Sequence, residues 1–398
     1  MKTTSHPNRF SRHTANLAAV VALGLVPSAP SADPETLPFP VITRFENFRM
    51  EQGMPSHKIH SVLKASDGRL WVGTWEGLLV RDSKGFHPIT TADGLSHKMI
   101  LGLAEDPTTG DIWVGTMRGL NRVSGGKVKA YLQTDSGLPN NVVYGVDVVG
   151  DHVWVATAAG TGDLNTRTGV WQIYDHNNAV MHEPWCYSIK GAGSVVYIGV
   201  WGGGIVEHDP SRGTFKEYRD PDADFHYDLV PDDGPVNDIT SWLTWDDGVL
   251  WQCTYFGFSR FDGRRWRTWV ESKSPLPSNF TQFVWSHRKV AWIGTDKGLS
   301  TTDGETWVNY SVSDKGTGLM EIHRPSQPVE KHTTDTALAH GFVLGVWVDD
   351  QEAWIATSDG LSHGLLSAAP GRRMAAHPTL PNTPKTSTDS HPNNITAP

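Results

Sequence analysis

The chain has 398 residues, of which 38% are apolar and only 19% are charged, and it contains 40 glycines and 17 tryptophans. Its formal net charge of -9 at pH 7 provides no long-range attraction to phosphate backbones and disfavours nucleic-acid binding. The many glycines and tryptophans favour short strands joined by tight turns over a helical fold, because glycine adopts positive φ and indole rings fill the space between sheets. The two cysteines allow at most one disulfide.

The N-terminal segment has the pattern of a secretory signal. Basic residues precede an apolar stretch over 17–26, and small residues follow over 28–32, in the order typical of a leader with its cleavage site. The apolar stretch is too short to remain as a membrane anchor. We therefore expect a signal at 1–32, a linker at 33–40, and a periplasmic or extracellular protein that does not span the membrane.

One motif recurs seven times after the linker, as in LWVGTWEGL from Leu70. Its central aromatic residue recurs at spacings of 42, 41, 43, 54, 41 and 62 residues. Four of the six spacings lie near 42, so the two long ones indicate insertions into a fixed unit. The aromatic residues are Trp71, Trp113, Trp154, Tyr197, Trp251, Trp292 and Trp354.

Each repeat predicts four strands. In the first repeat these are His57 to Lys64, Leu70 to Thr74, Leu78 to Arg81 and Phe86 to Thr90. The second strand is apolar on both faces, as expected when neighbouring sheets cover it on either side. A four-stranded unit of this length, repeated seven times, matches the blades of a β-propeller.

A circular array of sheets must also hide its first and last edges. The seventh repeat ends near Leu366 without a fourth strand, and the segment Val41 to Phe45 resembles the missing strand. We therefore predict an all-β, seven-bladed β-propeller over 41–366, closed by an N-terminal strand that completes the last blade. Residues 367–398 are rich in proline, threonine and serine and are predicted to form a disordered tail.

The repeat resembles that of the two-component regulator propeller family, which combines a Gly-Leu-Pro loop, an inner strand and a Trp-Val/Ile-Gly-Thr-x-x-Gly-Leu signature. Gly53–Pro55, Gly94–Ser96 and Gly137–Pro139 match the first part, and the tryptophan motifs match the second. The resemblance implies a ligand-sensing role, since such propellers commonly form the extracytoplasmic part of membrane-bound sensor kinases. Without a kinase, DNA-binding or transmembrane segment in the sequence, we expect a stand-alone secreted member.

Strand order determines which loops share a face of the ring. In a four-stranded up-and-down blade, the connection into the first strand and the turn between the second and third strands lie at the same end, which we call the upper face. Both insertions, 220–233 and 311–336, fall in connections into a first strand. The second insertion contains His323 and His332. Because function gathers on the loops of rigid scaffolds, the upper face is the candidate site.

Histidines are frequent in these upper-face connections. His57, His97 and His340 precede the first strands of units one, two and seven, which become neighbours when the ring closes. His182 and Cys186 of unit four are expected to face them across the pore. Imidazoles around one opening can hold a zinc or copper ion and leave a coordination position open. Alternatively, these rim histidines are solvated or cap backbone carbonyls.

The turns between second and third strands add aromatic and charged side chains to the same face. Flat side chains bury area at little entropic cost and suit an aromatic small molecule, a glycan or a peptide. The predicted ligand-binding residues are Trp75, Glu76, Arg118, Trp201, Tyr255, Phe256 and Lys297.

Two functions remain open at this point. The first is a secreted or periplasmic module that binds a small molecule, glycan, peptide or protein partner at its upper-face pore. The alternative is a copper- or zinc-dependent lyase or oxidase that uses the histidine cluster, with Glu183 as the candidate acid or base. Some antibiotic-opening lyases also use seven-bladed propellers with a catalytic histidine and a metal near the pore, an analogy of fold alone.

Overall fold

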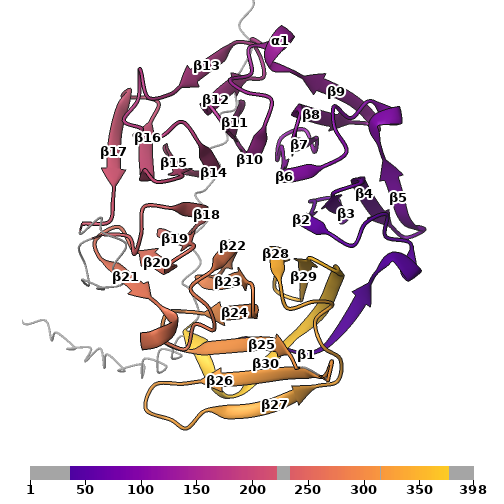
Figure 1. The fold of residues 1–398 in the computed structure, drawn as a ribbon, viewed down its shortest axis with the longest axis vertical. Coiled ribbons are helices and arrows are strands. Elements are labelled where there is room, and N and C mark those ends of the chain that lie inside the picture. Colours follow the sequence, from indigo (N-terminus) through magenta and orange to yellow (C-terminus); the bar gives the residue numbers. More distant parts are fainter. Residues whose placement is uncertain (1–35, 222–233, 314, 376–398) are drawn as a thin grey trace, which may run out of the picture. The chain divides into compact units, whose positions relative to one another are not determined.

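The computed structural model describes residues 36–221, 234–313 and 315–375. Within this part of the chain, seven antiparallel sheets are arranged around a central axis (Figure 1). The first strand of each sheet faces the axis, and the sheets are stacked face to face around the ring. The predicted seven-bladed propeller is therefore confirmed. The predicted signal lies outside the described residues, as does most of the predicted tail.

Blades one to four each contain four consecutive strands. Blade one comprises β2 (Ile59–Lys64), β3 (Leu70–Thr74), β4 (Gly77–Asp82) and β5 (Gly85–Ile89). Blade two comprises β6 (Ile100–Glu105), β7 (Ile112–Thr116), β8 (Gly119–Ser124) and β9 (Lys127–Tyr131). Blade three comprises β10 (Val143–Val149), β11 (His152–Thr157), β12 (Gly160–Asn165) and β13 (Trp171–Tyr174). Blade four comprises β14 (Cys186–Ala192), β15 (Val195–Val200), β16 (Gly204–Asp209) and β17 (Thr214–Tyr218).

The last three blades include one enlarged sheet and the closing sheet. Blade five comprises β18 (Thr240–Asp246), β19 (Val249–Thr254), β20 (Gly257–Phe261) and β21 (Trp266–Trp269). Blade six comprises β22 (Thr281–His287), β23 (Val290–Thr295), β24 (Gly298–Thr302), β25 (Trp307–Val312), β26 (Gly318–His323) and β27 (Glu330–Thr334). Blade seven comprises β28 (Val343–Val348), β29 (Glu352–Thr357), β30 (Gly360–Ala375) and β1 (Thr36–Phe48).

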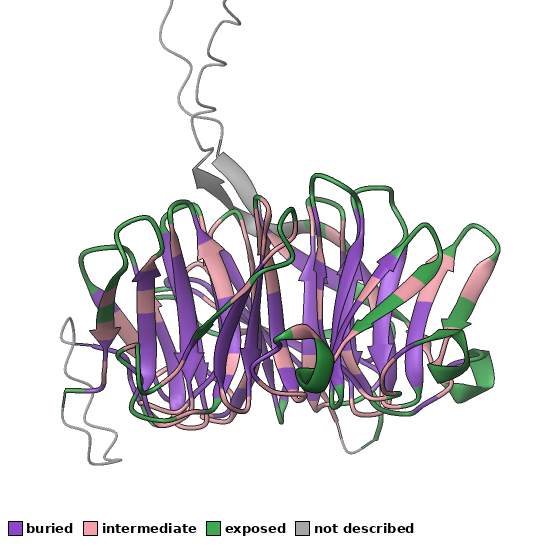
Figure 2. Ribbon diagram, turned by 90° about the horizontal axis from the view of Figure 1, so that it is seen from above, coloured by how far each residue is buried: buried purple, intermediate pink, exposed green. Residues whose placement is uncertain are grey.

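Short helices lie in connections between blades: α1 (Gln133–Ser136), η1 (Met50–Gln52), η2 (Thr91–Asp93) and η3 (Glu271–Lys273). They mark the upper face, which points downward in Figure 2. Burial is concentrated in the strands, and the exposed residues gather in the loops at the two faces (Figure 2). The second strands are the most deeply buried, and Trp113, Trp251 and Trp292 are at most 1% exposed. The repeated tryptophans therefore pack between blades.

Ring closure follows the predicted arrangement with longer strands. β1 pairs with β30 and supplies the fourth strand of blade seven. It begins at Thr36, inside the predicted linker, and β30 continues beyond Leu366 to Ala375. The two closing strands thus extend on either side of the range 41–366 that the sequence predicted for the propeller. Residues 36–39 and 370–375 belong to a compact unit distinct from residues 40–369, which hold the ring.

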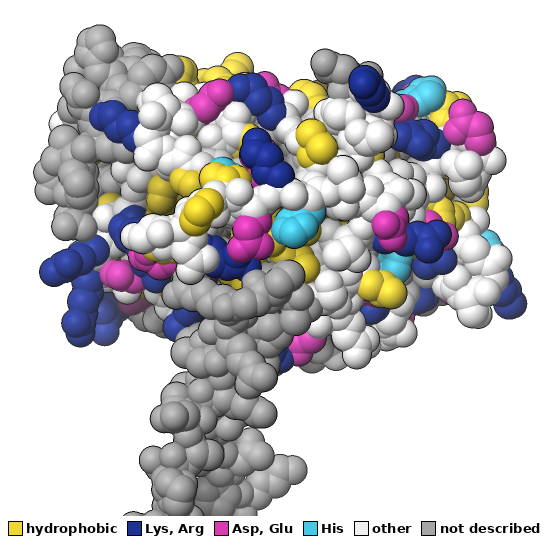
Figure 3. All heavy atoms as spheres, turned by 90° about the horizontal axis from the view of Figure 1, so that it is seen from below, with side chains coloured by type: hydrophobic (Ala, Val, Ile, Leu, Met, Phe, Trp, Pro, Cys, Tyr) yellow, Lys and Arg dark blue, Asp and Glu magenta, His cyan; other side chains and the backbone are white. Residues whose placement is uncertain are grey.

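The insertion at 311–336 differs from the prediction. Instead of an upper-face loop, its described residues form the hairpin β26–β27, which extends blade six at its outer edge. The segment GLMEIH alternates between more buried and more exposed side chains, as expected for a strand with one face on the core. Met320 and Ile322 are buried while Leu319 is exposed. His323 and His332 therefore lie on the outside of the ring, contrary to the sequence-based expectation. Figure 3 shows this edge, where acidic and basic side chains are interspersed.

The enlarged blade six also holds the closing strand in place. Tyr310 on β25 accepts a hydrogen bond from the backbone N–H of Ile42 over 2.8 Å, and its ring packs edge-on against Phe45 at 5.7 Å. Beyond β27, the Asp335 N–H donates to the Thr43 carbonyl over 2.9 Å, and the Thr336 hydroxyl accepts from the Phe45 N–H over 2.8 Å. The insertion therefore fixes the outer edge of β1.

This arrangement predicts the effect of Tyr310→Phe. The substitution keeps the ring and leaves the buried Ile42 N–H without an acceptor, which costs about 1–3 kcal/mol. Urea unfolding followed by near-ultraviolet circular dichroism should show a correspondingly lower free energy of unfolding. Thr333→Ala, at an exposed position on β27 of the same blade, is the control and should unfold like the parent. Equal stability of all three proteins would contradict a role for the Tyr310 hydroxyl in closure.

Candidate functional site

The upper face carries a continuous series of aromatic rings, which we call the aromatic arc: Tyr144, Tyr187, Trp201, Tyr255, Phe280 and Phe342. Successive ring centroids lie 4.5, 5.1, 5.1, 4.5 and 6.2 Å apart. The six residues come from blades three to seven, and each is only partly buried. Aromatic neighbours at these distances stabilise one another and present a rigid apolar surface.

Two features of the local backbone, β-bulges and turns, determine where these rings point. Every inner strand has a β-bulge close to its start, and Tyr144 and Tyr187 are the bulged residues of β10 and β14. A bulge redirects a side chain and is frequent beside functional sites. Trp201 and Tyr255 instead begin the turn between second and third strands, at equivalent repeat positions. Burial raises the pKa of Tyr187 and Tyr255, so both remain neutral phenols.

The turn of blade four departs from the repeat. In blade five, the Thr254 hydroxyl donates to the Gly257 carbonyl over 2.9 Å and accepts from the Phe256 N–H over 3.0 Å. Blade four has Val200 at the position of this threonine, followed after Trp201 by three glycines. Gly204 has φ of 69°, and a Cβ there would lie 2.3 Å from the Tyr218 carbonyl oxygen. Only glycine allows this close approach.

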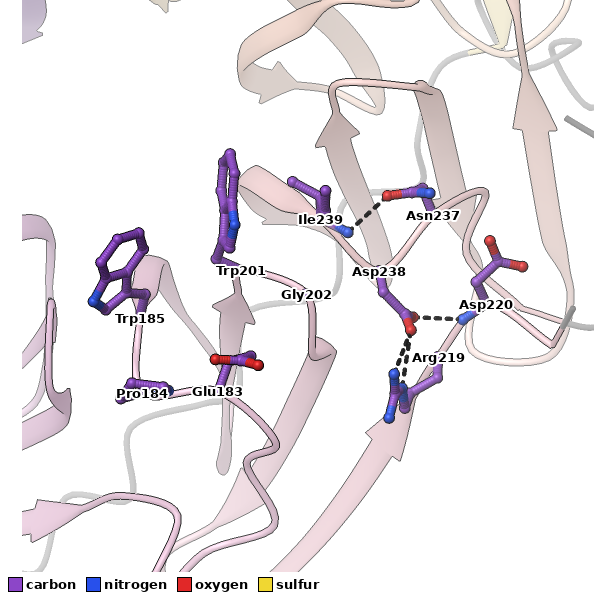
Figure 4. Close-up of a pocket in the computed structure, with 10 residues that line it drawn as sticks. All are labelled: Glu183, Pro184, Trp185, Trp201, Gly202, Arg219, Asp220, Asn237, Asp238 and Ile239. Carbon is purple, nitrogen blue, oxygen red and sulfur yellow. Dashed lines mark hydrogen bonds and ion pairs between the residues drawn. The ribbon is translucent and has the colours of Figure 1, made fainter. Parts of the chain in front are cut away.

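Beside this unusual turn lies a pocket of about 520 Å³ between blades four and five (Figure 4). Its walls come from the loop before β14, the turn after β15, the end of β17 and the loop before β18. The lining residues are Glu183, Pro184, Trp185, Trp201, Gly202, Arg219, Asp220, Asn237, Asp238 and Ile239. Trp201 belongs to both the pocket and the aromatic arc, so the two features form one surface.

One wall of the pocket is held by an ion pair. Asp238 Oδ2 accepts hydrogen bonds from Arg219 Nε over 3.0 Å and from Nη2 over 2.6 Å, and Oδ1 accepts from the Asp220 N–H over 2.7 Å. The bond to Asp238 raises the pKa of Arg219. Asn237 Oδ1 accepts from the Ile239 N–H over 2.9 Å. These bonds make the blade-five side of the pocket a preorganised polar wall.

The opposite wall is aromatic. The backbone N–H of Trp201 donates to the Trp185 carbonyl over 2.8 Å, and Trp201 also forms a β-bridge with Ile239. Trp185 is nevertheless 47% exposed, an unusual state for an indole ring on the rim of a pocket. Figure 4 shows both indole rings extending in the same direction, with Glu183 and Pro184 on the loop below them.

The predicted ligand-binding residues are spread over the ring. Trp201 and Tyr255 belong to the aromatic arc, and Phe256 follows Tyr255 in the same turn. The Lys58 ammonium lies 3.8 Å from the ring centroid of Trp75. The remaining residues lie in turns of other blades: Glu76 pairs with Lys98 over 2.8 Å, Lys297 pairs with Glu271 over 2.6 Å, and Arg118 is exposed.

The structure places His57 and His340 against one turn. His57 Nδ1 lies 2.7 Å from Asp359 Oδ1, and His340 Nδ1 accepts from the Ser358 hydroxyl over 2.8 Å and from the Phe342 N–H over 2.9 Å. Both histidines are thus anchored to the turn before β30. Their nearness agrees with ring closure, but each has its own local partner.

The other two histidines have local partners as well. His97 Nδ1 accepts from the Met99 N–H over 3.0 Å, and His182 Nε2 lies 2.8 Å from Glu217 Oε1 on β17. Burial raises the pKa of the Cys186 thiol to about 12, so it stays protonated at neutral pH. Across residues 36–221, 234–313 and 315–375, no three His, Cys, Asp or Glu side chains form a group that could hold a metal ion.

Several residues of this surface were missed by the sequence reasoning: Tyr144, Tyr187, Trp185, Arg219, Asn237, Asp238, Phe280 and Phe342. A signal for the pocket was present in blade four, where Val200 and the three glycines replace the repeat pattern. The arc had no comparable signal, because its members occupy different repeat positions.

The fold defines the class as a seven-bladed β-propeller. The model of the two component regulator propeller family matches residues 53–76, which run from the loop before blade one to its second-to-third-strand turn. The resemblance predicted from the sequence is therefore confirmed in this repeat. No curated protein sequence gives a significant match to the chain, and none of the described helices is long and apolar enough to cross a membrane.

Solved structures share the propeller at low sequence identity. The extracellular domain assigned to a one-component system of B. thetaiotaomicron aligns with a TM-score of 0.61 and 16% identity, over 81% of this chain and 40% of that domain. The extracellular domain assigned to a hybrid two-component system of the same organism aligns with a TM-score of 0.61 and 18% identity, over 82% and 42%. This chain thus spans less than half of either domain.

A second kind of propeller is also similar. A streptogramin B lyase aligns with a TM-score of 0.56 and 16% identity, over 82% of this chain and 97% of that protein. Virginiamycin B lyase from Staphylococcus aureus aligns with a TM-score of 0.58 and 13% identity, over 82% and 99%. At these identities the likeness concerns the fold alone.

Proposed function

We propose that this protein is a secreted or periplasmic propeller that binds a small molecule, glycan or peptide on its upper face. The observation that carries the proposal is the junction of the blade-four pocket with the aromatic arc at Trp201. A concave site with flat apolar walls and a few fixed polar groups is the usual form of a ligand site in proteins. The blade-four pocket has this form, because the indole ring of Trp185 and the polar Arg219 side chain both line it.

Two further observations support the location outside the cytoplasm. The N-terminal sequence has the order of a secretory leader, and the two sensor structures described above are extracellular domains. A metal-dependent lyase or oxidase built on His57, His97, His182 and His340 has only the shared fold of the lyases in its favour. Ligand binding is therefore the function that the geometry supports best.

A Trp201→Ala variant tests this proposal. Ligands are first found by thermal-shift screening of the mature protein against aromatic compounds, oligosaccharides and peptides, and their affinities are measured by calorimetry. Removing the ring shared by pocket and arc should weaken the ligand about tenfold or more, as expected for a central aromatic contact.

Trp75→Ala is the matched control, because Trp75 has the same repeat position in blade one and does not line the pocket. It should leave the affinity unchanged. A ligand whose affinity survives Trp201→Ala and falls in Trp75→Ala would refute the blade-four site. Circular dichroism spectra of both variants establish that each retains the fold.

A further inference from the structure

The charges that line the blade-four pocket are unbalanced. Three carboxylates, Glu183, Asp220 and Asp238, and one guanidinium, Arg219, line it, which gives a formal net charge of -2. Arg219 already donates two hydrogen bonds to one carboxylate oxygen of Asp238. Among the described residues that line the pocket, Arg219 is thus the one cation, and it is already paired.

Glu183 provides the carboxylate that faces a ligand. It is exposed, and in the part of the chain that the structure describes its carboxylate makes neither an ion pair nor a hydrogen bond. Its stem lies against the backbone of the glycine turn, since a Cβ on Gly202 would be 3.6 Å from Glu183 Cγ. The side chain is therefore held at the pocket rim by the same turn that carries Trp201.

The indole rings beside Glu183 complete the pattern. Trp185, Trp201 and Glu183 all line the pocket, and the two indole rings extend in the same direction from its wall (Figure 4). The face of an indole ring attracts a cation through its quadrupole, and tryptophan is the best aromatic residue for this contact. The chain's formal net charge of -9 acts in the same direction, because it favours the approach of cations over long distances.

We propose that the blade-four pocket binds a small organic cation, with its ammonium or guanidinium group held between Glu183 and the indole faces of Trp185 and Trp201. This inference rests on the proposed ligand-binding function and names the class of ligand. A volume of about 520 Å³ suits a small molecule. The carbon skeleton of the ligand extends from Trp201 toward Tyr255 along the aromatic arc.

Choline and its neutral isostere 3,3-dimethylbutan-1-ol provide a matched pair of probes with the same shape. Ligand-observed nuclear magnetic resonance at low ionic strength gives the affinity of each for the full chain. Choline should bind about tenfold more tightly than the alcohol, because cation–π attraction and a carboxylate act on the charged probe alone. Methylguanidinium serves as a second cation and should also bind.

Two variants test the contributions of the carboxylate and of the indole rings separately. Glu183→Gln preserves shape and should reduce the advantage of choline over the alcohol to the part that comes from cation–π attraction, while Trp185→Ala should weaken both probes. Glu76→Gln is the control, because Glu76 is a carboxylate in the β3–β4 turn of blade one, is paired with Lys98 and does not line the pocket; it should change nothing.

The outcomes distinguish the cation inference from the proposed function. Equal binding of choline and the alcohol, an advantage of choline that Glu183→Gln leaves unchanged, or no binding of either cation overturns the cation inference. Any of these results leaves the general proposal standing if the ligands found by screening remain sensitive to Trp201→Ala. If those ligands are insensitive as well, both proposals fail.

Discussion

A chain that starts at Arg49, and therefore lacks β1, is expected to lose the closed ring. β1 is the outer strand of blade seven, and it buries Val41, Ile42 and Phe45 to at most 2% exposure. Without it, β30 presents an unpaired edge, and apolar surface of blades six and seven becomes exposed. Unpaired edges and exposed apolar surface together favour aggregation.

Size-exclusion chromatography and near-ultraviolet circular dichroism measure this loss directly. The shortened chain should aggregate or give a weak tryptophan signal, whereas a chain that starts at Thr36 should behave like the full protein. A synthetic peptide of residues 36–48, added in excess, should restore the signal in a concentration-dependent way, because it binds only the folded ring.

A single substitution on β1 tests the same role with a smaller expected loss of stability. Phe45→Ala removes a buried aromatic ring that packs against Tyr310 at 5.7 Å, and such a change costs about 3–5 kcal/mol in a protein core. Monomeric, cooperatively unfolding protein of parental stability from both the Arg49-start chain and Phe45→Ala would show that the ring does not depend on β1.

The architecture was predictable from the sequence because each blade repeats the same physical pattern. A tryptophan in a fully buried second strand, followed by a glycine turn, recurs at Trp71, Trp113 and Trp292, and seven copies allow a closed ring. The closing strand was predictable as well, since the last repeat lacks a strand that the segment around Ile42 resembles. Its ends were not, because strand length depends on pairing with β30.

The site was only partly predictable, for a physical reason. Sequence periodicity identifies the face on which a turn lies, so Trp201 and Tyr255 were placed on the upper face. It does not indicate that Tyr187 reaches Trp201 through a β-bulge, or that Asp238 binds Arg219 across a blade boundary. These contacts depend on distances between blades, which repeat position alone does not specify. The hairpin at β26–β27 was missed because its short alternating pattern lies inside an insertion.

Acidification is expected to destabilise the protein below about pH 6.5, the ordinary pKa of histidine. Burial lowers the pKa of His208 and of His60. His208 is 1% exposed and lies among aromatic rings, stacked on Phe215 at 4.3 Å and 4.6 Å from Tyr174. Its Nδ1 bonds to the Thr214 carbonyl over 3.1 Å, while Nε2 has no partner in the described residues.

The direction in which stability changes with pH follows from the lowered pKa of these two histidines. Between the lowered folded pKa and the ordinary unfolded pKa, the unfolded chain binds more protons than the folded one. The stabilisation is therefore fully present above about pH 6.5 and is lost as the pH falls toward the folded pKa. The two buried histidines act in the same direction, so their contributions to the pH dependence add.

Other ionisable groups near His208 act differently. Burial raises the pKa of Asp163 despite its bond to His152 at 2.8 Å, and hydrogen bonds lower the pKa of Asp209. The raised pKa of Asp163 acts in the opposite direction to the histidines, because the folded state then binds the additional proton, and the lowered pKa of Asp209 acts below the ordinary carboxylate value near 4. Variants at His60 and His208 therefore separate the histidine contribution from that of the carboxylates.

Urea unfolding at pH 5.0 and pH 7.5 measures the dependence. His60→Leu is a natural replacement, because Leu101 has the same position in blade two, and His208→Phe keeps an aromatic ring in the cluster. Each variant should lose part of the stability difference between the two pH values, and the double variant should lose most of it. His176→Gln, at an exposed position, should retain the full difference. A double variant with the parental pH dependence would assign the acid sensitivity to other groups and refute this explanation.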